Sequence, residues 1–153
     1  MLHNLKATQI LNSDIDTVWE FMSNPSNLSK ITPEYMGFEV HTDLKGRSMY
    51  QGQIIEYTVR PLLGIPLHWV TEITHVKEKE YFVDEQRFGP YSFWHHQHWI
   101  LPHKNGVEMF DEVHYRLPLG PLGKIANALY IKKQLEGIFR HRYQVLNNIF
   151  NKP

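Results

Sequence analysis

The middle of the chain alternates apolar and polar residues over short stretches, as half-buried β-strands do. In one stretch Ile55, Tyr57 and Val59 fall on one face, with polar residues between them. Short turns separate the stretches, and Asn105-Gly106 is a strong hairpin signal. Consecutive strands joined by short turns predict an antiparallel meander. The predicted strands are Leu2–Leu11, Phe38–Val40, Tyr50–Arg60, Leu67–Val76, Tyr81–Phe88, Phe93–Leu101 and Val107–Leu117.

Helical spacing of apolar residues appears after the first strand and again at the end of the chain. Ile15–Met22 predicts a short helix that Ser13 or Asp14 caps, and Asn24-Pro25 begins a second short helix. Leu122–Phe150 predicts one long amphipathic helix. We expect its apolar stripe to contain Leu122, Ile125, Ala126, Leu129, Ile138, Phe139, Leu146 and Ile149.

This order of elements predicts an α+β fold in a single domain over residues 1–153. A curved antiparallel sheet of about seven strands would surround the long C-terminal helix, with two short helices after the first strand. A sheet curled around a helix rarely fills its own hollow, so we expect a cavity for a ligand.

Composition narrows the classes of function. Lys plus Arg and Asp plus Glu both number 16, and this neutrality predicts no nucleic-acid partner. Cysteine is absent, which excludes disulfides and thiolate chemistry. The N-terminus has no signal-peptide pattern and no apolar run reaches the ~18 residues of a membrane span, so we predict a cytoplasmic protein without membrane insertion. No phosphate-binding loop is visible, and we predict no cofactor.

Alternate residues of a strand share a face, so strand periodicity predicts which side chains could contact a ligand. We expect the more charged face of each strand to point toward solvent. This puts His96 and His98 inside and His95 and Gln97 outside, although a register error of one residue would reverse them. The predicted ligand-binding residues are Tyr57, Trp69, Asp84, Gln86, Phe88, Trp94, Val113 and Tyr115, and the candidate catalytic residues are His96, His98 and Asp111.

Three interpretations of this His/Asp cluster stay open. A satisfied polar network would fix the sheet and orient a ligand. Alternatively, His96 or His98 would transfer a proton while Asp111 or Asp84 holds the imidazole tautomer. His-x-His with an aspartate is also a plausible metal ligand set. Such pairs are common by chance, however, and we predict no resident metal.

Two segments carry a resemblance to a known family. FVDEQRFGPYSFWHHQHWI (Phe82–Ile100) and DEVHYRLPLG (Asp111–Gly120) resemble bacterial SRPBCC ligand-binding and cyclase/dehydrase proteins. The whole architecture resembles the START-like, helix-grip superfamily, which includes Bet v 1-type allergens and polyketide cyclases. The resemblance implies a hydrophobic cavity for a small ligand and assigns no reaction.

Three functions therefore remain open. The first is binding of a hydrophobic small molecule that is lipid-, isoprenoid- or polyketide-like, or aromatic. The second is a cyclase or dehydratase that uses the His/Asp cluster. The third is a protein–protein regulatory module whose interface is the apolar segment Pro61–Pro66. That segment also suits a lid or a homodimer contact.

Overall fold

The computed structural model describes residues 1–44, 46, 48–62, 64–118 and 120–152. The order of its strands and helices is close to the predicted one. In chain order they are β1 (His3–Leu11), α1 (Ile15–Met22), η1 (Pro25–Ile31), η2 (Glu34–Met36), β2 (Glu39–Val40), β3 (Gln53–Leu62), β4 (Ile65–Lys77), β5 (Tyr81–Phe88), β6 (Phe93–His103), β7 (Gly106–Arg116), α2 (Gly120–Ala126), η3 (Asn127–Ile131) and α3 (Lys132–Phe150).

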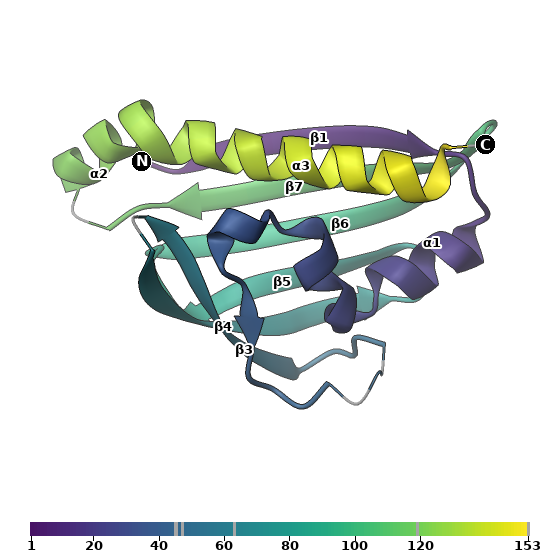
Figure 1. The fold of residues 1–153 in the computed structure, drawn as a ribbon, viewed down its shortest axis with the longest axis horizontal. Coiled ribbons are helices and arrows are strands. Elements are labelled where there is room, and N and C mark those ends of the chain that lie inside the picture. Colours follow the sequence, from purple (N-terminus) through teal and green to yellow (C-terminus); the bar gives the residue numbers. More distant parts are fainter. Residues whose placement is uncertain (45, 47, 63, 119, 153) are drawn as a thin grey trace.

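The strands form one curved, seven-stranded antiparallel sheet in the order β1-β7-β6-β5-β4-β3-β2. Only β1 leaves the sequential meander, because it pairs with β7 at the far edge. The helices lie on one face of this sheet, and α3 runs along β1 (Figure 1). The predicted α+β fold with a curved antiparallel sheet and a long C-terminal helix is confirmed.

The two short helices begin where their caps predict. Asp14 accepts a hydrogen bond from the Thr17 backbone N–H and so caps α1. Asn24 caps η1 in the same way, with Pro25 in its first turn. The apolar face of α1 packs into the main core through Val18, which is fully buried, together with its neighbours. That core also contains Leu11, Trp19, Met22, Ile55, Ile73, Phe82, Ile100, Val107, Met109, Leu146 and Phe150.

The prediction of a loop at Pro61–Pro66 is wrong for the residues that the structure describes. β3 continues to Leu62 and β4 begins at Ile65, so these strands form a tight hairpin in which the two residues pair. Leu63 lies outside the described residues. An apolar run full of turn residues can therefore be the tip of a hairpin rather than a linker.

The C-terminal segment is helical throughout but is not one regular α-helix. A π-helical turn, η3, separates α2 from α3. A π turn adds a residue to the helical repeat and shifts the faces on either side of it. Leu122, Ile125 and Leu129 are exposed, contrary to the predicted apolar stripe, and α2 packs on η3 rather than on the sheet. Ile149 near the far end is also half exposed.

Candidate functional site

Strand register brings the predicted cluster together. Asp84 of β5 pairs with His96 of β6, and His98 of β6 pairs with Asp111 of β7. His96 and His98 are both buried, whereas His95 lies on the outer face against Glu85. The predicted strand phase of these histidines is therefore confirmed.

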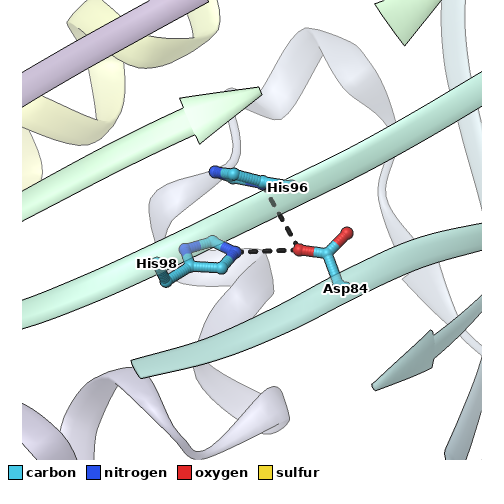
Figure 2. A group of neighbouring side chains, drawn as sticks. All are labelled: Asp84, His96 and His98. Carbon is cyan, nitrogen blue, oxygen red and sulfur yellow. Dashed lines mark hydrogen bonds and ion pairs between the residues drawn. The ribbon is translucent and has the colours of Figure 1, made fainter. Parts of the chain in front are cut away.

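The two imidazoles lie between two carboxylates. One oxygen of Asp84, Oδ2, is 3.3 Å from His96 Nδ1 and 2.8 Å from His98 Nε2. Figure 2 shows both contacts converging on this single oxygen. On the other side, Asp111 Oδ1 is 3.1 Å from His96 Nε2 and 2.9 Å from His98 Nδ1. All four ring nitrogens therefore face a carboxylate.

Two further side chains hold the carboxylates in place. Arg142 reaches in from α3, and its Nη2 is 3.2 Å from Asp111 Oδ1 and 3.2 Å from His98 Nδ1. Trp94 donates its indole N–H to the second oxygen of Asp84, Oδ1, at 3.1 Å. The cluster thus ties three strands to the C-terminal helix.

Opposite charges set the protonation states of the carboxyls. Burial would raise the pKa of Asp111, but the charge of Arg142 and the imidazole hydrogen bonds hold that pKa well below its usual range. Burial would likewise raise the pKa of Asp84, yet the charge and hydrogen bonds of His96 and His98 lower it. Both carboxyls are therefore ionised at neutral pH.

The pKa values of the two histidines shift in opposite directions. Burial lowers the pKa of His98, and the charge of neighbouring His96 lowers it further. Burial would also lower the pKa of His96, but Asp84 and Asp111 outweigh it and raise that pKa. Arg142 is thus the fixed positive charge of the cluster, and His96 is the imidazole that takes up a proton more readily.

An internal cavity of about 310 Å³ opens beside this cluster. Aromatic and aliphatic side chains make up most of its wall. The cavity lies between the sheet, η1, η2 and the C-terminal helix. Thr71 links two of the wall's rings, because its hydroxyl contacts both the Tyr57 hydroxyl and the Trp69 indole N–H. The predicted ligand-binding or catalytic residues that line the cavity are Tyr57, Trp69, Asp84, Trp94, His96 and His98.

Phe88 does not face the cavity, and the prediction of an inward orientation is wrong. Its side chain is 61% exposed and packs on the outward-facing ring of His68. The register explains the change: Thr71 pairs with Gln86 while Val70 pairs with Phe88, so β5 carries one extra residue there. Such a bulge reverses the alternation beyond it.

Four other predicted residues point inward without lining the cavity. Gln86 instead fixes the β5–β6 connection, because its amide bonds both the N–H and the carbonyl of Tyr91. Val113 and Tyr115 are buried against Leu135 of α3. Asp111 lies behind the imidazoles and lines a second hollow of about 300 Å³ between β1 and α3.

Arg142 is the functional side chain that sequence reasoning missed. A cation near a helix C-terminus is usually a solvated charge that interacts favourably with the helix end, but Arg142 is only 7% exposed. Its position in the helical repeat indicates burial. Leu135 and Phe139 precede Arg142 by seven and three residues and Leu146 follows it by four, so all four residues share one helix face. A cation in an apolar stripe opposite buried carboxylates is a candidate partner for them.

The sequence matches no family model and no curated protein. Solved structures are similar in fold. A protein from Chromobacterium violaceum has a TM-score of 0.73 at 10% identity, with 98% of each chain covered. Major latex-like protein 151 from Panax ginseng has a TM-score of 0.70 at 12% identity, covering 100% of this chain and 99% of that one.

An enzyme shares the same architecture. A point mutant of norcoclaurine synthase from Thalictrum, in complex with a transition-state analogue, has a TM-score of 0.66 at 14% identity, covering 97% of this chain and 96% of that one. Among the described residues, no helix is both long and apolar enough to cross a membrane. These likenesses show that the chain has the Bet v 1 or SRPBCC type of helix-grip fold.

Proposed function

We propose that this protein binds a hydrophobic small molecule, lipid-, isoprenoid- or polyketide-like, in the internal cavity. The observation that carries the proposal is a volume of about 310 Å³ walled mainly by apolar side chains. Ligand pockets of this kind usually combine an apolar wall with a few polar groups that fix orientation. One protein of the same fold, the norcoclaurine synthase point mutant, forms a complex with a transition-state analogue, which supports a ligand-binding role for this fold.

The histidine and aspartate side chains of this cavity gather on one wall. Asp84, His96 and His98 line the cavity there, whereas Tyr57, Trp69 and Thr71 present mainly ring faces and one shared hydroxyl. A ligand with an apolar body and a single polar end fits this division. Its oxygen or nitrogen would lie against the imidazoles, and the rest would contact the aromatic rings.

Native mass spectrometry of the purified protein tests the proposal directly. We expect an adduct of a few hundred daltons that organic extraction releases. A fluorescent apolar probe then measures affinity in the extracted protein. Ile138→Trp projects a larger side chain from α3 into the cavity, and we expect it to weaken probe binding at least tenfold.

Ile149→Trp is the matched control, because Ile149 lies on the same helix, is 46% exposed and does not line the cavity. It should leave probe affinity unchanged. The proposal fails if no probe or adduct binds, or if both tryptophan variants weaken the probe equally.

Proton-transfer catalysis is a second candidate function, of the cyclase or dehydratase type. The specific observation is that two imidazoles face the cavity, each backed by a carboxylate within hydrogen-bonding distance. Conversion of the co-purified molecule, followed by mass spectrometry, tests it. His98→Ala should then lower the rate by about 100-fold while probe affinity stays within about tenfold.

A further inference from the structure

The imidazole pair has more carboxylate contacts than N–H groups. Four contacts join its ring nitrogens to Asp84 Oδ2 and Asp111 Oδ1, and the longest is 3.3 Å. Two neutral imidazoles carry only two N–H groups. Only the contacts of His96 Nε2 with Asp111 and of His98 Nε2 with Asp84 have hydrogen-bond geometry. His96 Nδ1 therefore faces Asp84 Oδ2 at 3.3 Å with a lone pair, an arrangement that a shared cation would stabilise.

Asp111 selects which nitrogens are free to bind a metal. It contacts His96 Nε2 and His98 Nδ1 with one oxygen, and Arg142 holds that oxygen from the helix side. A carboxylate that accepts the outer N–H of each metal-ligating histidine is the usual support of a metal site. In the metal-free protein Arg142 Nη2 donates to His98 Nδ1, and His98 Nε2 bonds Asp84. Metal binding would move the His98 proton to Nδ1, where Asp111 Oδ1 lies 2.9 Å away, so that the lone pairs of His96 Nδ1 and His98 Nε2 face Asp84.

The three inner atoms have the spacing of metal ligands. Asp84 Oδ2, His96 Nδ1 and His98 Nε2 all lie within 4.8 Å of one another. Ligands of a tetrahedral Zn²⁺ with bonds near 2.0–2.1 Å are about 3.3 Å apart. The separation from Asp84 Oδ2 to His96 Nδ1 is 3.3 Å, and the 2.8 Å to His98 Nε2 requires only a small rotation of the carboxylate.

We propose that Asp84, His96 and His98 bind one divalent transition-metal ion, of the Zn²⁺ or Fe²⁺ class, on the cavity wall. Asp111 and Arg142 form its outer support, and the Trp94 N–H holds the second oxygen of Asp84.

The three protein ligands leave a coordination position that opens into the cavity. All three line its wall, while the opposite side of the imidazoles is closed by Asp111 and Arg142. Metal sites with three protein ligands and one open position bind a substrate or water there. This step rests on the proposed function: a ligand whose polar end is a carboxylate, carbonyl or hydroxyl would coordinate the metal.

Zn²⁺ and Co²⁺ are the probes for the test. The protein is dialysed against a chelator, and Zn²⁺ is then titrated in competition with a chromophoric chelator. We expect one Zn²⁺ per chain, and we expect Co²⁺ to give the intense visible absorption of a low-coordinate site with nitrogen ligands. Asp111→Asn should weaken Zn²⁺ binding by about 10- to 100-fold.

His98→Ala should weaken Zn²⁺ binding more than Asp111→Asn does. His95→Ala is the matched control, because His95 lies on the same strand but faces outward against Glu85, and it should bind Zn²⁺ as the wild type does. Circular dichroism checks folding, and His98→Gln replaces His98→Ala if that variant does not fold. The absence of stoichiometric binding, retention of binding in the His98 variant, or only the weak spectrum of octahedral Co²⁺ in the wild type each overturn the metal site.

Titrating the apolar fluorescent probe into the metal-free protein separates the two proposals. Probe binding without Zn²⁺ binding leaves the hydrophobic cavity standing and overturns only the metal site. Zn²⁺ binding without probe binding supports the metal site and overturns the proposed hydrophobic ligand.

Discussion

Replacing Arg142 by methionine tests whether the buried cluster is held together by charge. Methionine keeps most of the apolar stem of arginine but removes the guanidinium. In the folded protein this guanidinium is 3.2 Å from Asp111 Oδ1, and Asp111 is only 2% exposed. Arg142→Met therefore leaves a buried carboxylate without its charged partner.

The expected loss follows from two opposing effects. Removing one partner of a buried ion pair costs about 3–5 kcal/mol. Arg142 Nε, however, is buried and has no hydrogen-bond partner among the residues that the structure describes, and such a group costs about 1–3 kcal/mol. Arg142→Met relieves that cost, and the central values of about 4 and about 2 kcal/mol give an expected net loss of about 2 kcal/mol in the free energy of unfolding at pH 7.

Urea denaturation of the metal-free protein, followed by tryptophan fluorescence, measures the loss. With a slope of about 2 kcal/mol per molar, the midpoint should fall by about 1 M. Arg140→Met, an exposed change on the same helix, should stay within about 0.5 kcal/mol of the wild type.

The pH dependence of this loss identifies its cause. In the wild type the pKa of Asp111 lies well below its usual range, so its ionisation contributes stability above the unfolded pKa of about 3.9. That contribution disappears as pH falls through the folded pKa. Without Arg142, burial raises the pKa of Asp111, and the variant takes up a proton at a higher pH. The loss in free energy of unfolding caused by Arg142→Met should therefore be largest near pH 7 and smaller at pH 4. A loss below about 1 kcal/mol at pH 7, or an equal loss at both pH values, would refute the charge argument.

Two further predictions concern the backbone and the corrected face of β5. Gly106→Ala should lower the free energy of unfolding by at least about 2 kcal/mol, because Gly106 has a φ of +122° and its Cβ would lie 2.2 Å from the Leu11 carbonyl oxygen. Gly137→Ala is its control in the same urea assay: no atom lies within 4 Å of the new Cβ, and a helical site should gain about 0.5–1 kcal/mol, so equal losses would contradict the steric argument. Phe88→Ser should leave the affinity of the apolar probe unchanged, because Phe88 is exposed outside the cavity; a tenfold loss in the probe titration would return it to the binding site.

Much of the fold could be predicted because the alternation along the strands carries physical information. On β6 and β7 the outward residues are the more charged ones, as Glu112 and His114 illustrate, and this placed His96 and His98 inside. The register between strands followed from short turns such as Asn105-Gly106. These two signals were sufficient to bring His96, His98 and Asp111 together on neighbouring strands.

The errors occur where one extra residue interrupts a regular period. The bulge beside Gln86 turns Phe88 outward, and the π turn at η3 interrupts the single regular helix that the sequence predicts. Neither insertion changes the apolar-to-polar pattern, so periodicity alone does not reveal it. Arg142 was missed for a different reason: a charged residue near a helix end is usually solvated, and only its partner on a distant strand shows otherwise.

Arg142 also links the C-terminal helix, which forms part of the cavity wall, to the His/Asp cluster. It is the charged side chain through which α3 contacts the His/Asp cluster, and it lines both the internal cavity and the hollow beside β1. An apolar residue at this position would pack α3 on the sheet without a buried charge to neutralise, and such replacements are often neutral or stabilising. Hydrophobic packing alone therefore gives no reason for an arginine here. Asp111 gives one, because two imidazoles can be kept facing the cavity in a fixed orientation only if the carboxylate behind them stays ionised.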